Sequence, residues 1–101
     1  MDETALAFLE VAFNNAEPRE IEGLMRPVFM ASDPANALGL TTANRPEGES
    51  YRSVITQLVD SGAIVPVDIR EQQGTQKLAG EEFYAITTEG EAILREAGLI
   101  A

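Results

Sequence analysis

The side chains that most often carry out acid–base and nucleophilic chemistry are missing from this sequence, which has no histidine and no cysteine. A serine has no imidazole to deprotonate it, so a Ser-His-Asp arrangement is impossible. Thiol catalysis and disulfide bonds are excluded, and the commonest transition-metal ligands are lacking. Carboxylates remain, but their spacing matches neither a calcium-binding loop nor a glycine-rich phosphate-binding loop. We therefore expect no enzyme, no cofactor and no metal site.

Carboxylates dominate the charge of the chain. Seventeen Asp and Glu residues face seven Lys and Arg residues, which gives a net charge of −10. Such acidity favours solubility through repulsion between copies, and it opposes binding to nucleic acid, whose phosphates attract Lys and Arg. Arginine outnumbers lysine and alanine is frequent. This composition favours a source in a bacterium, a phage or an archaeon.

The length and hydrophobicity of the chain fit one domain spanning residues 1–101. Hydrophobic residues make up 45% of the sequence, enough for an apolar core. No apolar run reaches the roughly 18 residues that suggest a membrane span. The acidic start at Met1–Thr4 lacks the positive charge of a signal peptide. We expect a cytoplasmic protein without a membrane partner.

In the N-terminal half, apolar residues recur at helical spacing over residues 4–16, which predicts a first helix. Pro18 fits the first position of a second helix, which Pro27 should end or kink. Residues 31–48 are expected to form a long loop or insertion containing one short apolar piece, opened by Ser32 as its cap. The apolar positions of the second predicted helix are Ile21, Leu24, Met25 and Val28.

In the C-terminal half, residues 51–60 have the clearest helical pattern of the chain, with Ser50 as the expected N-cap. The period then changes to that of β-structure. Two β-prone runs, 64–69 and 83–87, predict an antiparallel hairpin with a long polar tip. Thr88 is expected to cap a last helix.

These patterns predict a core and a second apolar surface. Phe8 and Val11 flank an apolar stripe on the first helix that is already wide enough to pack on a core, so they suggest a homodimer through that helix. The residues expected to be largely buried are Leu9, Phe13, Leu24, Val54, Leu58, Ile64, Tyr84, Ile86 and Leu94.

Two stretches resemble winged-helix regulators of the PadR and MarR type. Tyr84–Leu94, with the pattern Tyr-x-Ile-Thr-x-x-Gly-x-x-x-Leu, resembles the end of their wing and the start of their last helix. Val54–Ile64, which leads into Gly-x-Ile, resembles the end of their recognition helix. The resemblance covers residues 50–96. It implies an α+β, winged helix-turn-helix-like domain with three or more helices and a two-stranded β-hairpin wing.

The N-terminal half departs from that family, and two segments could supply the first helix of the helix-turn-helix. Ala35–Thr42 is similar to the start of such a motif, although the turn before Ser50 is several residues too long. Residues 18–30 are the other candidate, with 31–48 as an insertion.

One function class is a DNA-binding transcriptional regulator, as the resemblance implies. Residues 45–77 carry a net charge of −1 and the rest of the chain −9, so the segment that would touch double-stranded DNA is nearly neutral. Base-reading side chains would come from the recognition helix, and phosphate contacts from the wing. The candidate nucleic-acid-binding residues are Arg52, Ser53, Thr56, Gln57, Arg70 and Lys77.

The other function class is an acidic protein-binding module, such as a phage-encoded inhibitor or DNA mimic that binds a basic host protein. The net charge favours this class, because long-range attraction would steer a basic partner to the surface. The candidate protein-binding residues are Glu17, Glu20, Glu22, Glu81 and Glu82.

Overall fold

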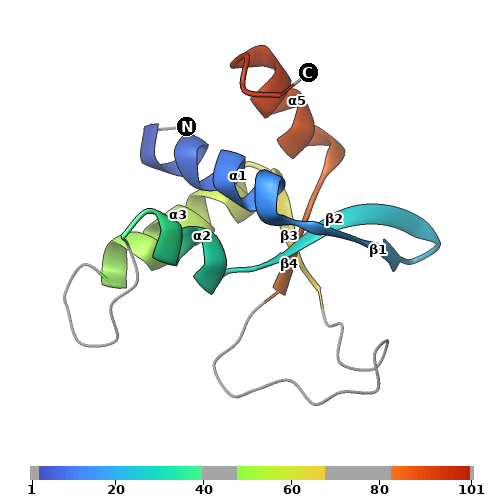
Figure 1. The fold of residues 1–101 in the computed structure, drawn as a ribbon, viewed down its shortest axis with the longest axis horizontal. Coiled ribbons are helices and arrows are strands. Elements are labelled where there is room, and N and C mark those ends of the chain that lie inside the picture. Colours follow the sequence, from blue (N-terminus) through green and yellow to red (C-terminus); the bar gives the residue numbers. More distant parts are fainter. Residues whose placement is uncertain (1–2, 40–47, 68–82, 101) are drawn as a thin grey trace.

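The computed structural model describes residues 3–39, 48–67 and 83–100, in which helices pack against an antiparallel sheet (Figure 1). The prediction of an α+β protein is confirmed for this part of the chain. The elements are α1 (Glu3–Asn15), β1 (Glu17–Ile21), β2 (Leu24–Met30), α2 (Ser32–Ala37), α3 (Gly48–Asp60), β3 (Ile64–Val67), β4 (Phe83–Ile86) and α5 (Thr88–Glu96). No described helix is long and apolar enough to cross a membrane.

The sheet has four strands in the order β1-β2-β4-β3, and all neighbours are antiparallel. The predicted pairing of the two C-terminal strands is confirmed between Ile64–Val67 and Phe83–Ile86. The prediction that these strands form a separate two-stranded wing is wrong, because β4 also pairs with β2, through Phe29 and Tyr84, in one four-stranded sheet. β4 therefore lies inside the sheet, between strands that are distant in sequence.

The helix predicted to begin at Pro18 is wrong, because this segment forms the β1–β2 hairpin. Glu22 and Gly23 connect the strands with φ values of +52° and +85°. Two successive positive φ values are typical of the tight turn that matches the twist of a hairpin. Pro18 lies directly opposite Pro27. Neither proline has an N–H, and the two form a non-hydrogen-bonded pair, in which the backbone N–H and C=O groups point away from the opposite strand. No hydrogen bond between β1 and β2 is therefore lost at this position.

Both edge strands contain a proline whose nitrogen faces away from the sheet. The Thr87 N–H donates to the Ala63 carbonyl, 3.0 Å away, and this bond sets the alternation along β3 and β4. Hydrogen-bonded and non-hydrogen-bonded pairs alternate along an antiparallel ladder, so the pair of Pro66 and Tyr84 is a non-hydrogen-bonded one and the backbone groups of Pro66 point away from β4. The backbone groups of Pro18 point away from β2 for the same reason. Proline on an edge strand removes a donor that another strand would need, so it opposes edge-to-edge association.

The core lies between the helices and one face of the sheet. Phe29 of β2 is at its centre, with its ring 6.3 Å from that of Phe8 and 6.0 Å from that of Tyr84. The predicted core residues Leu9, Val54, Leu58, Ile64, Tyr84, Ile86 and Leu94 are buried. Phe13 is only half-buried. Leu24 is 58% exposed and that prediction is wrong, because the residue follows the hairpin turn instead of facing inward from a helix.

Helix starts differ from the predicted ones by one to three residues. The cap of α5 is Thr87, not Thr88, and its hydroxyl accepts a hydrogen bond from the Gly90 N–H at 3.0 Å. Helix α3 starts at Gly48, so Ser50 lies within its first turn. Within the segment predicted as a loop or insertion, α2 follows Ala31, and Ser32 is its first residue instead of its cap.

Candidate binding surface on the sheet

One face of the sheet, here called the outer face, is turned away from the core and is largely apolar. Side chains alternate along a strand, so the residues next to those in the core point to this face. Val28 and Ala85 are buried there, in a cluster that includes no described helical residue. Ile21, Val67 and Phe83 pack around them, while Leu24 and Val65, 58% and 43% exposed, extend the apolar surface toward solvent.

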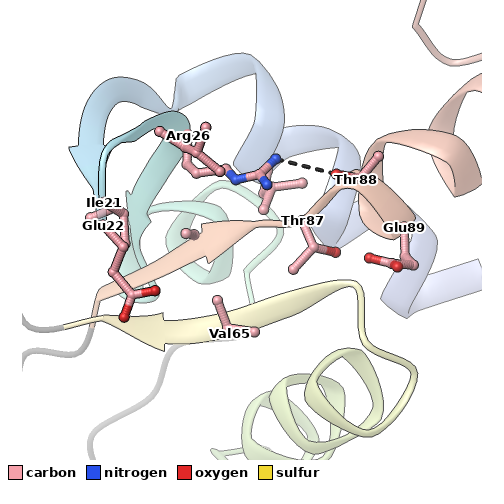
Figure 2. Close-up of a pocket in the computed structure, with 10 residues that line it drawn as sticks. Ile21, Glu22, Arg26, Val65, Thr87, Thr88 and Glu89 are labelled. Carbon is pink, nitrogen blue, oxygen red and sulfur yellow. Dashed lines mark hydrogen bonds between the residues drawn. The ribbon is translucent and has the colours of Figure 1, made fainter.

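A pocket of about 400 Å³, here called the hairpin pocket, lies at one end of the outer face (Figure 2). Pro27 has no N–H to donate, and the register between β2 and β4 ends at Val28. Beyond that point the hairpin tip no longer pairs with β4, and the pocket lies between the two. It is lined by Ile21, Glu22, Leu24 and Arg26, by Val65, and by residues 85–89.

Two arginines lie opposite each other in the hairpin, and each donates a hydrogen bond to a different acceptor. Arg19 lies opposite Arg26, an arrangement in which like charges destabilise a strand pair. The Arg19 guanidinium donates to the Glu17 carboxylate at 3.1 Å. The Arg26 Nη1 donates to the Thr88 Oγ1 at 3.3 Å, which links the hairpin to the start of α5 across the pocket (Figure 2).

Two carboxylates lie at opposite ends of the hairpin pocket, Glu22 on the hairpin turn and Glu89 in the first turn of α5 (Figure 2). Both residues are exposed. The rest of the lining is mostly aliphatic and consists of Ile21, Leu24, Val65, Ala85 and Ile86, with Arg26, Thr87 and Thr88. The arrangement therefore has an apolar centre, one cation at its side and an anion at each end.

The predicted DNA-contacting residues are partly brought together by α3. Arg52, Ser53 and Thr56 are exposed, while Gln57 is half-buried. The apolar stripe of the same helix, represented by Val54 and Leu58, is buried in the core. Arg70 and Lys77 lie outside the described residues.

The predicted acidic protein-binding residues are separated by the hairpin. Glu17, Glu20 and Glu22 are all exposed. Glu17 faces the outer side of the sheet, Glu20 points to the opposite side by alternation along β1, and Glu22 lies at the turn, where it lines the pocket. Glu81 and Glu82 lie outside the described residues.

No protein-family model matches this sequence, and searches of curated proteins and of solved structures find no match. The resemblance to PadR- and MarR-type regulators therefore remains a prediction from two short motifs.

The hairpin pocket was not predicted from the sequence. Its signal was Gly23, flanked on both sides by segments that each contain a proline, a pattern that a hairpin accommodates more easily than a helix does.

Of the two residues that suggested a homodimer through the first helix, Phe8 and Val11, only Val11 reaches the surface. Phe8 is fully buried against Phe29, so its side chain is not available on the surface of α1. Val11 is half-buried.

Proposed function

We propose that this protein is a non-enzymatic binding module that uses the outer face of its sheet to bind a basic protein. The observation that carries the proposal is an apolar sheet face whose pocket has a carboxylate at each end. Exposed apolar patches with polar rims are typical of protein-binding sites. The charge of −10 supports a basic partner, which would be attracted over long range.

The charges of the described residues also support a basic protein as the partner. Its arginines are Arg19, Arg26, Arg52 and Arg95, and three of them already contact an acceptor within the chain. Acidic residues outnumber them on α1, on the hairpin and on α5. A basic partner would therefore meet uncompensated carboxylates.

The experiment is affinity capture of basic proteins by the immobilised wild type and by a variant with Glu17, Glu22 and Glu89 replaced by Lys, since all three are exposed and lie on the outer face or in its pocket. Proteins captured by the wild type alone are then purified and titrated directly at several salt concentrations. We expect affinity that falls as salt rises and that the triple variant loses. Equal binding by both forms would contradict the proposal.

A DNA-binding transcriptional regulator with a winged-helix arrangement is the second candidate. The exposed polar face of α3 favours it, since Arg52, Ser53 and Thr56 are side chains that can contact base edges. A gel-shift assay with genomic DNA fragments at low salt tests this candidate, because phosphate contacts are then strongest. Retardation that is lost in an Arg52→Ala variant would favour DNA, and no retardation would leave the protein-binding proposal.

A further inference from the structure

We infer that the hairpin pocket is the specificity site of this surface and that it binds a linear segment in which basic residues flank one aliphatic residue. This inference rests on the proposed function and deepens it, because it names the chemistry of the bound segment. The pocket volume of about 400 Å³ is within the ~300–1,000 Å³ common for ligand pockets. It is therefore large enough to enclose a side chain of the partner.

The centre of the pocket selects an uncharged, apolar group. Ile21, Leu24 and Val65 offer aliphatic surface, and Ala85 continues it on β4. The Arg26 guanidinium crosses the pocket to Thr88, so its aliphatic stem adds to the apolar lining (Figure 2). Its positive charge repels a lysine or arginine that would enter the centre. An aliphatic side chain carries no charge for Arg26 to repel, and it can contact the aliphatic lining.

The two ends of the pocket select positive charge. Glu22 and Glu89 lie on either side of the apolar centre and are both exposed (Figure 2). A segment that places its aliphatic residue in the centre extends its neighbours toward these carboxylates. Basic neighbours gain attraction there, and acidic neighbours are repelled.

Charge complementarity decides between the occupants of this face. A second copy of the chain has the same charge of −10 and would add its own carboxylates to those at the pocket. A nucleic acid would bring phosphates close to Glu22 and Glu89. A basic, partly apolar protein segment satisfies both the centre and the ends.

The first test is selection from a phage-displayed library of random linear peptides on the full-length protein. We expect the selected peptides to share an aliphatic residue between basic residues, and a synthetic copy of one of them to perturb the amide resonances of residues 21–26 and 85–89. A selection that enriches no peptide, or acidic ones, would overturn the inference. The proposed function would then still be judged by its own capture experiment.

Two neighbouring residues provide a matched pair of variants for the pocket centre. Leu24 and Met25 are 58% and 64% exposed, but they point to opposite faces of β2 and only Leu24 lines the hairpin pocket. Leu24→Asp is expected to weaken binding of the selected peptide at least about tenfold, and Met25→Asp less than about twofold. Equal losses would overturn the inference, while leaving a less specific protein-binding surface intact.

The pocket ends have a matched pair of their own. A Glu22→Lys, Glu89→Lys variant is expected to weaken binding about tenfold at low salt, and the difference should shrink at high salt. Glu20→Lys, Glu96→Lys changes the net charge equally but alters no residue of the pocket. If the control weakens binding as much, net charge and not the pocket carries the recognition. Far-UV circular dichroism of all four variants confirms that they fold, since each altered side chain is exposed.

Discussion

Gly90 shows how a single missing side chain lets α5 pack against the turn that follows α3. It is buried in the first turn of α5. A Cβ added there would overlap the Ala63 carbonyl oxygen and lie 2.9 Å from Ile86 Cγ2. Together with the Thr87 cap, this contact gives a physical reason for the Ile-Thr-x-x-Gly pattern of the sequence.

Gly90→Ala is therefore expected to destabilise the protein, although alanine is the better helix former. We expect a loss of about 1–3 kcal/mol in the free energy of unfolding, as for other overpacked sites. Urea denaturation measures it. Ala92→Gly, at an exposed position of the same helix, should lose about 1 kcal/mol through helix propensity alone. An increase in stability for Gly90→Ala would show that α5 does not pack as closely as described.

Glu22 is the one described non-glycine residue with a positive φ, +52°. Residues other than Gly, Asn and Asp are disfavoured in this conformation. Glu22→Asn should therefore stabilise the hairpin, by about 0.5–1 kcal/mol. The same substitution removes a carboxylate from the hairpin pocket, so it should weaken binding of a basic segment. Thermal unfolding and peptide titration of one variant measure both effects, and reduced stability would argue against the turn geometry.

Helix α3 is the predicted recognition helix, and two neighbouring residues allow a test of whether its apolar stripe anchors it to the core. Leu58 is fully buried, while its neighbour Val59 is 37% exposed. Leu58→Ala should reduce the free energy of unfolding by about 2–5 kcal/mol. Val59→Ala should change it by about 0.5 kcal/mol or less. Similar values for both variants in urea denaturation would mean that α3 is not packed on this side.

The elements that the sequence predicted well are those with a single consistent period. Helices α1 and α3 repeat their apolar residues over several turns, and β3 and β4 follow a clear change of period. The β1–β2 hairpin was missed because Ile21, Leu24, Met25 and Val28 fit helical spacing equally well. Strand pairing with β4 decided between the two structures, and that contact joins residues far apart in the sequence.

The candidate site was harder to predict for the same reason. Arg52, Ser53 and Thr56 follow from the period of one helix, and they are exposed as expected. The hairpin pocket instead combines the hairpin turn, β3 and the junction of β4 with α5. No local pattern indicates that Glu22 and Glu89 share a pocket.

At the scale of the whole molecule, the net charge of −10 is expected to make stability depend on salt. Repulsion among carboxylates is screened as the Debye length falls from ~30 Å at ~0.01 M to ~3 Å at ~1 M. The urea midpoint should therefore rise with sodium chloride concentration. A Glu3→Gln, Glu96→Gln variant, altered at exposed positions, should show a smaller rise. A midpoint that falls with salt would mean that attractive ion pairs outweigh the repulsion.

The position of β4 has a consequence for synthesis on the ribosome. Val28 pairs with Ala85, so the N-terminal hairpin cannot join its sheet until residues 83–85 have been made. A two-stranded hairpin alone is at best marginally stable in water. Stalled nascent chains should therefore become resistant to protease only after residues 83–100 have left the ribosome. Until then the core around Phe29 lacks Tyr84, Ile86 and Leu94, and we expect the unfinished chain to be a substrate for chaperones and proteases.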